Sequence, residues 1–161
     1  MACLCSRGSM FEKILVCLDG SAFAEHILPY AIEIAARFGG ALVLLQVVDM
    51  PSIVFGPGQS VVRPDWAERM RTELDKAEDY LARLAAPLRQ QGLEPETVAL
   101  EGVAGETIVA YAEENGVDLV CIATHARSSV GRWVFGSIED LVLKKSGLPV
   151  LAIRTRDTEA E

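Results

Sequence analysis

The sequence predicts a single α/β domain in which a mostly parallel sheet carries helices on both faces. Short apolar runs of strand length alternate with longer helical patterns, in the order βαβαβαβαβ. The strands are continuous apolar runs rather than alternating ones, as is typical of parallel strands that are buried on both faces. The length of 161 residues fits one domain of ordinary size.

The first strand and helix are predicted within residues 14–40. Residues 14–18 (ILVCL) form an apolar run that ends at Asp19-Gly20-Ser21, and Ser21 is a suitable N-cap for the next helix. Pro29 lies inside that helix, so we expect a kink there. Gly39-Gly40 is a helix-ending signal. One helix face is predicted to carry Ile27, Ala31, Ile34, Ala35 and Phe38.

The middle of the chain is predicted to contain a buried strand, a long loop, a long helix and a weaker strand. Residues 41–48 (ALVLLQVV) form the second strand, and a loop rich in proline and glycine follows. The longest helical pattern covers residues 65–91 and stops at Gly92. Residues 96–101 are more polar than the other strands, which favours an edge position in the sheet.

The last third of the chain is predicted to contain two strands, each preceded by a helix. A short helix over residues 105–114 leads to a fourth apolar strand at 118–123. A polar loop begins at Thr124, and a helix over 137–145 leads to the fifth strand at 149–153. These elements define an open, Rossmann-like sheet of five strands.

Charge and hydropathy exclude two classes of partner. The chain has 15 Lys and Arg against 23 Asp and Glu, a net charge of -8. Because a chain this acidic repels the phosphate backbone of nucleic acids at long range, we expect no nucleic-acid partner. No apolar run reaches the ~18 residues of a membrane span, so we expect no membrane partner. A small molecule or another protein remains.

The two ends of the chain are expected to lie outside the domain, which we place at residues 10–155. Residues 7–10 (RGSM) resemble a cloning junction, so we interpret residues 1–9 as a cloning-derived leader. Residues 156–161 are expected to form a disordered tail. Cys17 and Cys121 each lie inside an apolar strand and are interpreted as packing residues rather than a disulfide or metal pair. The absence of a signal sequence favours a cytoplasmic location.

The most informative segment is the loop at residues 124–136, which is small, hydroxyl-rich and basic within an acidic chain. It leads into a helix N-terminus, where free backbone N–H groups and the helix dipole favour an anion. In open parallel sheets ligands bind at the carboxyl ends of strands, which would bring Asp19, residues 47–49 and this loop around one crevice. An ordinary capping loop with solvated Arg127 and Arg132 explains the same composition equally well.

Several motifs in the right order resemble the universal stress protein family. Its nucleotide-binding members carry Gly-x-x-Gly, nine residues, and then Gly-Ser or Gly-Thr. Here residues 123–126 (ATHA) are followed by nine residues and then Gly136-Ser137. The resemblance covers nearly all of residues 10–154, including 13–16 (KILV), 19–21 (DGS), 45–49 (LQVVD), 115–119 (NGVDL) and 149–153 (PVLAI).

This resemblance implies a cytoplasmic domain with strand order 3-2-1-4-5 that is commonly a homodimer through its last strand and often binds ATP, with Mg²⁺ accompanying the nucleotide. Carried over by position, Leu18 and Asp19 would lie against the adenine end, and Val47 beside the base. The ribose-phosphate path would be lined by Ala123, Thr124, Ala126 and Arg127. The phosphates would meet Gly136, Ser137 and Ile138.

The motif departs from the family at two glycines, which leaves two functions open. Ala123 ends a strand, where extended backbone accepts a methyl group, but Ala126 falls in the turning loop, where a methyl group could displace a phosphate. One interpretation is an ATP-binding stress regulator. The other is a dimeric interaction module of the same fold that has lost the nucleotide. We assign no catalytic residue and no metal ligand, and expect at most a slow ATPase.

Overall fold

The computed structural model describes residues 10–49, 55–56, 59–60, 65–125 and 137–155 of the chain. The predicted leader, the predicted tail and the loop at 126–136 lie outside these residues. Within them, five strands form one sheet: β1 (Lys13–Leu18), β2 (Ala41–Asp49), β5 (Glu96–Gly102), β6 (Leu119–His125) and β7 (Val150–Thr155). Their order is β5-β2-β1-β6-β7, and every neighbouring pair is parallel. The predicted fold class and the strand order 3-2-1-4-5 are confirmed.

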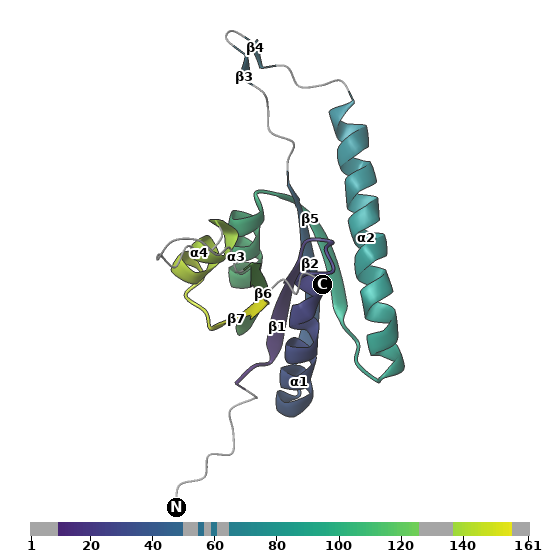
Figure 1. Cartoon of the computed structure of the whole chain (residues 1–161), viewed down its shortest axis with the longest axis vertical. Coiled ribbons are helices and arrows are strands. Elements are labelled where there is room, and N and C mark those ends of the chain that lie inside the picture. Colours follow the sequence, from purple (N-terminus) through teal and green to yellow (C-terminus); the bar gives the residue numbers. More distant parts are fainter. Residues whose placement is uncertain (1–9, 50–54, 57–58, 61–64, 126–136, 156–161) are drawn as a thin grey trace, which may run out of the picture.

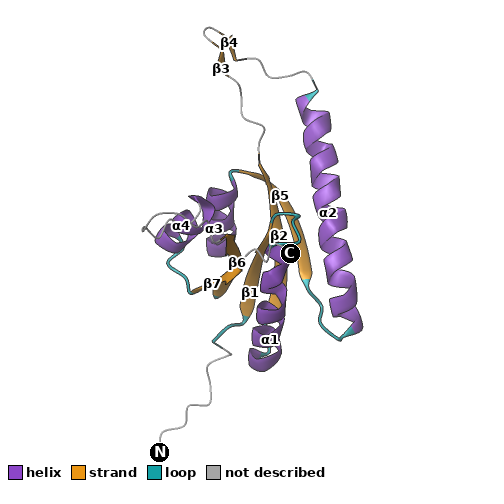
Figure 2. Ribbon diagram, in the orientation of Figure 1, coloured by secondary structure: helices purple, strands orange, loops and turns teal. Residues whose placement is uncertain are grey.

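Helices cover both faces of the sheet, as Figures 1 and 2 show. On one face lie the short 3₁₀ helix η1 (Ala24–Ile27), α1 (Leu28–Phe38) and the long α2 (Trp66–Gln90). On the other face lie α3 (Ala104–Glu114) and α4 (Ser137–Lys145). Each face has its own cluster of buried apolar side chains, and the central strands contribute alternate residues to the two clusters.

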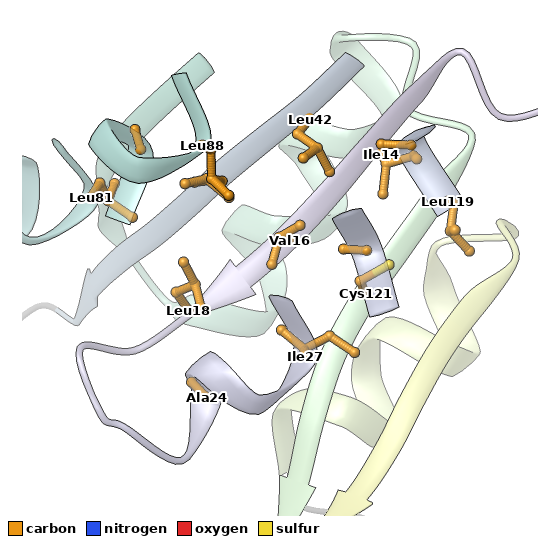
Figure 3. Close-up of a cluster of buried hydrophobic side chains, with 14 residues drawn as sticks. Ile14, Val16, Leu18, Ala24, Ile27, Leu42, Leu81, Leu88, Leu119 and Cys121 are labelled. Atoms are coloured by element: carbon orange, nitrogen blue, oxygen red, sulfur yellow. The ribbon is translucent and has the colours of Figure 1, made fainter. Parts of the chain in front are cut away.

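Strand β1 is the most deeply buried element. Its residues Ile14, Leu15 and Val16 have no exposed surface, and Cys17 and Leu18 are at most 7% exposed. Figure 3 shows Ile14, Val16 and Leu18 pointing into the cluster that also contains Ile27 and Leu81 of the covering helices. Because β1 also pairs with β2 on one side and β6 on the other, it forms the centre of the fold.

Three local predictions need correction. Pro29 does not kink a continuous helix: the segment forms η1 first, and Pro29 occupies the first turn of α1, where its missing N–H is not needed. Within the predicted loop after β2, residues Phe55–Gly56 (β3) and Gln59–Ser60 (β4) form a short antiparallel hairpin. The fourth strand of the sheet, β6, runs on to His125, so Thr124 belongs to the strand and not to the loop.

The two cysteines in the core are free thiols on neighbouring strands. Cys17 belongs to the cluster under α3 and α4, and Cys121 to the cluster under α1 and α2, so the two side chains lie on opposite faces of the sheet. Burial raises the pKa of Cys17, with a further contribution from Cys121, and burial raises the pKa of Cys121 to about 12. The interpretation of both as packing residues is confirmed.

A carboxylate joins the amino ends of β1 and β6. One oxygen of Asp118, Oδ2, accepts hydrogen bonds from the backbone N–H groups of Glu12 and Lys13, both at 2.9 Å. The Asp118 N–H in turn donates to the Lys13 carbonyl at 2.9 Å. These bonds fix the start of β1 against the start of β6 and so set the register of the sheet centre.

Replacing Asp118 with alanine is expected to lower the free energy of unfolding by about 1–2 kcal/mol, because two backbone N–H groups lose a charged acceptor. Asp118→Asn retains a side-chain oxygen and should lose less. Urea denaturation of both variants measures the effect, with Glu113→Ala on the exposed side of α3 as the control. An Asp118→Ala protein with the parent's midpoint and slope would show that this clamp contributes nothing.

The buried thiols are expected to resist modification in the folded protein. In a Cys3→Ser/Cys5→Ser background, a thiol reagent at pH 8 should label Cys17 and Cys121 only after denaturation, because their thiolates are disfavoured in the core. Since both folded pKa values are raised from the ordinary 9.0, the thiols contribute stability below about pH 9 that is lost as pH rises further. Rapid labelling of either thiol under native conditions would contradict this packing.

Candidate functional site

The carboxyl ends of β1, β2 and β6 form one edge of the sheet, and most of the predicted site residues lie there. Leu18 pairs with Gln46, and Cys17 pairs with Ile122 on the opposite side of β1. Strand β1 is followed by crossovers on one face, and β6 is preceded and followed by crossovers on the other. This reversal makes the edge around β1 and β6 the topological switch point, where open α/β sheets bind ligands.

Asp19 begins a tight turn that joins β1 to η1. Its Oδ1 atom accepts hydrogen bonds from the backbone N–H of Ser21 at 2.9 Å and from the Ser21 hydroxyl at 2.6 Å. The Ser21 Oγ atom in turn accepts the N–H of Ala24, the first residue of η1, at 3.1 Å. The N-cap position of η1 is occupied by Phe23, so the prediction of Ser21 as the N-cap is wrong, and its hydroxyl group instead ties the turn to the start of η1. Gly20 between them has φ of 85°, a conformation that favours glycine. The turn therefore holds an exposed carboxylate in a defined position at the edge.

Leu18 and Val47 are close to this turn but on different faces of the sheet. The Leu18 side chain is 5% exposed and packs in the cluster with Ala24 and Ile27, as Figure 3 shows. Val47 is partly buried and packs on the face that α3 and α4 cover. The Leu18 side chain is thus committed to the core, so only its backbone remains available to a ligand, whereas Val47 keeps part of its side chain accessible.

Strand β6 supplies the next two predicted residues. Ala123 pairs with Ile153 of β7, and Thr124 pairs with Arg154. Because Ala123 lies in extended strand backbone, its methyl group replaces the family's glycine hydrogen without backbone strain. Thr124 is one of the few buried polar residues of the described chain, at 7% exposure. Alternation along β6 places its side chain on the same face as Val120 and Ile122, the face that α3 and α4 cover.

Helix α4 begins at Ser137 and runs back from the carboxyl edge toward the start of β7. Ile138, its second residue, is partly buried against the cluster under α3 and α4. Acidic residues occupy its first turn, and Lys144 and Lys145 occupy its last turn. Three further predicted site residues, Ala126, Arg127 and Gly136, lie outside the described residues.

The end of β2 is tied to the start of α3. Asp49 Oδ1 accepts the backbone N–H of Ala104, the first residue of α3, at 3.2 Å. Asp49 pairs with Gly102 at the end of the neighbouring strand β5, and α3 follows β5 directly. The Asp49 carboxylate therefore caps α3 from the adjacent strand. The sequence placed Asp49 near the crevice, and the structure gives it this structural role.

Two polar side chains near the turn were not singled out from the sequence. Gln46 lies in β2 beside Leu18, and Tyr80 reaches the same region from α2. Burial raises the pKa of Tyr80, and the negative charges of Glu25 and Asp19 raise it further, against a smaller opposing effect of Arg83. The guanidinium of Arg83 lies 5.4 Å from the centre of the Tyr80 ring. The sequence signal for Gln46 was its polarity inside an apolar run.

The described residues bring no three metal-ligating side chains together. Nor does any helix in the described part of the chain combine the length and apolar character that crossing a bilayer requires.

Fold and edge together define a Rossmann-like α/β protein whose candidate ligand-binding edge is formed by the Asp19 turn, the ends of β2 and β6, and the start of α4. The family profile described as the universal stress protein family matches residues 10–154, which is most of the chain. The chain belongs to the universal stress protein family, a family of stress-response proteins.

Relatives of known sequence and structure agree with this assignment. Universal stress protein MJ0531 of Methanocaldococcus jannaschii is 26% identical over 91% of this chain and 84% of its own length. The solved structure of MJ0577 from the same organism has a TM-score of 0.76 and 26% identity, covering 92% of this chain and 99% of that one. The structure of universal stress protein UspA from Lactobacillus plantarum has a TM-score of 0.74 and 25% identity, covering 89% of this chain and 98% of that one.

More distant proteins of this fold have been solved with adenine nucleotides. An Arabidopsis thaliana family member holds AMP, with a TM-score of 0.60 and 16% identity over 92% of this chain and 95% of that one. An Archaeoglobus fulgidus universal stress protein is in complex with dAMP. Its structure has a TM-score of 0.57 and 22% identity, covering 89% of this chain and 98% of that one. At these identities the likeness to this chain is one of fold.

Proposed function

We propose that the protein is an adenine-nucleotide-binding regulator of the stress response that acts in the cytoplasm. The observation that carries this proposal is the convergence of the Asp19 turn, Val47 and Thr124 at one sheet edge, from which α4 starts. The exposed Asp19 carboxylate can accept a hydrogen bond from a base or ribose. The N-terminus of α4 at Ser137 can hold phosphates through its backbone N–H groups.

ATP is the nucleotide we propose, with Mg²⁺ accompanying it. Mg²⁺ keeps several waters and is commonly held by substrate phosphates rather than by a protein cage, so the absence of a cluster of ligands among the described residues is compatible with it. The ten residues proposed to contact the nucleotide are Leu18, Asp19, Val47, Ala123, Thr124, Ala126, Arg127, Gly136, Ser137 and Ile138. We assign no general base, so any hydrolysis of ATP is expected to be slow.

A dimeric interaction module without nucleotide is the alternative. Ala126 favours it, because that position carries a methyl group where nucleotide-binding family members have glycine. Ala123 does not, since its place in β6 accommodates a side chain. Acid extraction of the purified protein, followed by chromatography of the supernatant, separates the two functions: a stoichiometric adenine nucleotide supports the regulator.

We also propose that two copies associate through β7. Among the residues that the structure describes, this strand pairs with β6 alone and forms one end of the sheet. Leu151 and Ile153 are only partly buried on the face of α1, and no helix follows the strand within the described residues. An apolar edge strand is an aggregation hazard unless it is paired, and a second β7 would provide that pairing.

The Ala126→Gly variant is expected to bind ATP more tightly than the parent, and a Gly136→Val/Ser137→Ala variant is expected not to bind. Removing the methyl group should gain about 1 kcal/mol, somewhat less than a tenfold change in Kd. Valine at 136 would keep the backbone away from the phosphates. Calorimetric titration of ATP with Mg²⁺, after bound nucleotide has been stripped, compares the three proteins.

Two results of this titration would contradict the proposal. Equal affinity in the parent and the Gly136/Ser137 variant would mean that the start of α4 is not the phosphate site. No heat in either the parent or Ala126→Gly would favour the nucleotide-free module.

The dimer is expected to dissociate when a charge is placed on β7. Ala152 is exposed in the middle of the strand, so Ala152→Lys should leave the fold intact while opposing strand pairing. Light scattering coupled to gel filtration at micromolar concentration should give a dimer for the parent and a monomer for the variant. Ala110→Lys on the exposed side of α3 is the matched control and should remain dimeric. A monomeric parent would overturn this proposal.

A further inference from the structure

Gln46 is an exception in the packing of the sheet. It is the one polar residue between Ala41 and Val48 of β2. The four residues before it, 42–45, are apolar and buried. Its Oε1 atom is shielded from solvent and accepts no hydrogen bond within the described part of the chain. A buried acceptor without a donor loses its hydration and gains nothing in return. Retaining glutamine here therefore destabilises the folded protein relative to an apolar side chain of similar size.

The place of this side chain connects it to the candidate site. Gln46 pairs with Leu18, the last residue of β1, and its alternation places it on the face of α1 and α2. Its Nε2 atom lies near Gly20, because a Cβ atom built on Gly20 would be 3.4 Å from it. The carboxamide thus lies beneath the turn that carries Asp19.

The turn above Gln46 can adjust its backbone. Gly20 has no side chain and adopts a positive φ, so its peptide groups rotate at low cost compared with those of other residues. The Asp19 carboxylate is held within the turn by Ser21, so the turn moves together with that carboxylate. Nε2 is the carboxamide atom that faces Gly20. A rotation of the carboxamide about its terminal torsion, together with a small displacement of the turn toward β2, would therefore bring a backbone N–H onto Gln46 Oε1.

We propose that Gln46 is a positioning residue for the bound nucleotide: when the base engages Asp19, the turn settles onto the carboxamide and a backbone N–H of the turn donates to Oε1. This inference rests on the proposed nucleotide-binding function and adds a residue that does not touch the ligand. Oε1 is unpaired in the free protein and gains a hydrogen bond only in the complex. Binding therefore removes the destabilisation caused by the unpaired acceptor, and this gain strengthens nucleotide binding.

The proposal has a signature that a purely structural role lacks. Replacing Gln46 with an apolar residue of similar length removes the unpaired acceptor, so the free protein should become more stable. The same change removes the hydrogen bond formed in the complex, so nucleotide binding should weaken. A residue that only supports the fold would lose stability and affinity together.

The experiment measures both quantities on the same variants. Gln46→Leu and Gln46→Met, in nucleotide-stripped protein, are each expected to raise the Tm by about 2–4 °C. In calorimetric titrations both are expected to weaken ATP binding about tenfold. Methionine has the length and flexibility of glutamine, so it tests the proposal even where leucine packs poorly. Tyr111→Phe, which removes a partly buried hydroxyl group on the face of α3 and α4, is the control and should leave the Kd within twofold of the parent's.

The outcomes separate this inference from the proposed function. A raised Tm together with weakened binding in the Gln46 variants, and unchanged binding in Tyr111→Phe, supports the positioning role. Parent-like affinity in both Gln46 variants overturns it and leaves nucleotide binding intact, as does equal weakening in Tyr111→Phe. A parent protein that binds no ATP overturns the proposed function and this inference with it.

Discussion

The rest of the structure depends on the two-sided pairing of β1 and the burial of its residues 14–18. Its apolar side chains enter both clusters alternately, and both of its edges are hydrogen-bonded. At its amino end, Asp118 fixes β1 against β6 through two backbone N–H groups. At its carboxyl end, the strand leads directly into the Asp19 turn. Because β1 is held on both sides, the turn that follows it begins at a fixed point of the carboxyl edge.

The central position of β1 also explains why the sheet has a topological switch point at its carboxyl edge. The connections through α1 and α2 carry the chain to one side of β1, over one face, and those through α3 and α4 carry it to the other side over the opposite face. The helices therefore diverge at the carboxyl edge near β1 and β6. Asp19 and Thr124, which we propose to contact the nucleotide there, are short and polar, while Leu18 and Val47 beside them pack into the two apolar clusters.

Much of this could be predicted from the sequence, because a buried parallel strand leaves a plain apolar run and helices leave a clear periodicity. The polar character of residues 96–101 predicted an edge strand, and β5 is one. The strand order itself came from the family resemblance, since periodicity does not say which strands are neighbours. β6 extends to His125 because Thr124 and His125 pair with β7, and such pairing between distant segments is invisible in the local pattern. Gln46 could not be identified from the sequence for a related reason. A single polar residue in an apolar run points to a role only once its unpaired oxygen and its position near Gly20 are known.

The central claim is that an adenine nucleotide binds at the carboxyl edge of this sheet. Amide NMR spectra of the protein titrated with ATP and Mg²⁺ test it most directly, because each backbone N–H reports on its own surroundings. The account predicts saturable shifts at Asp19, Gly20, Val47 and Thr124 and at the start of α4, with Asp118 and Gly40 at the opposite edge unchanged. Shifts confined to the opposite edge or to the exposed side of α2, or a spectrum that ATP leaves unaltered, would contradict it.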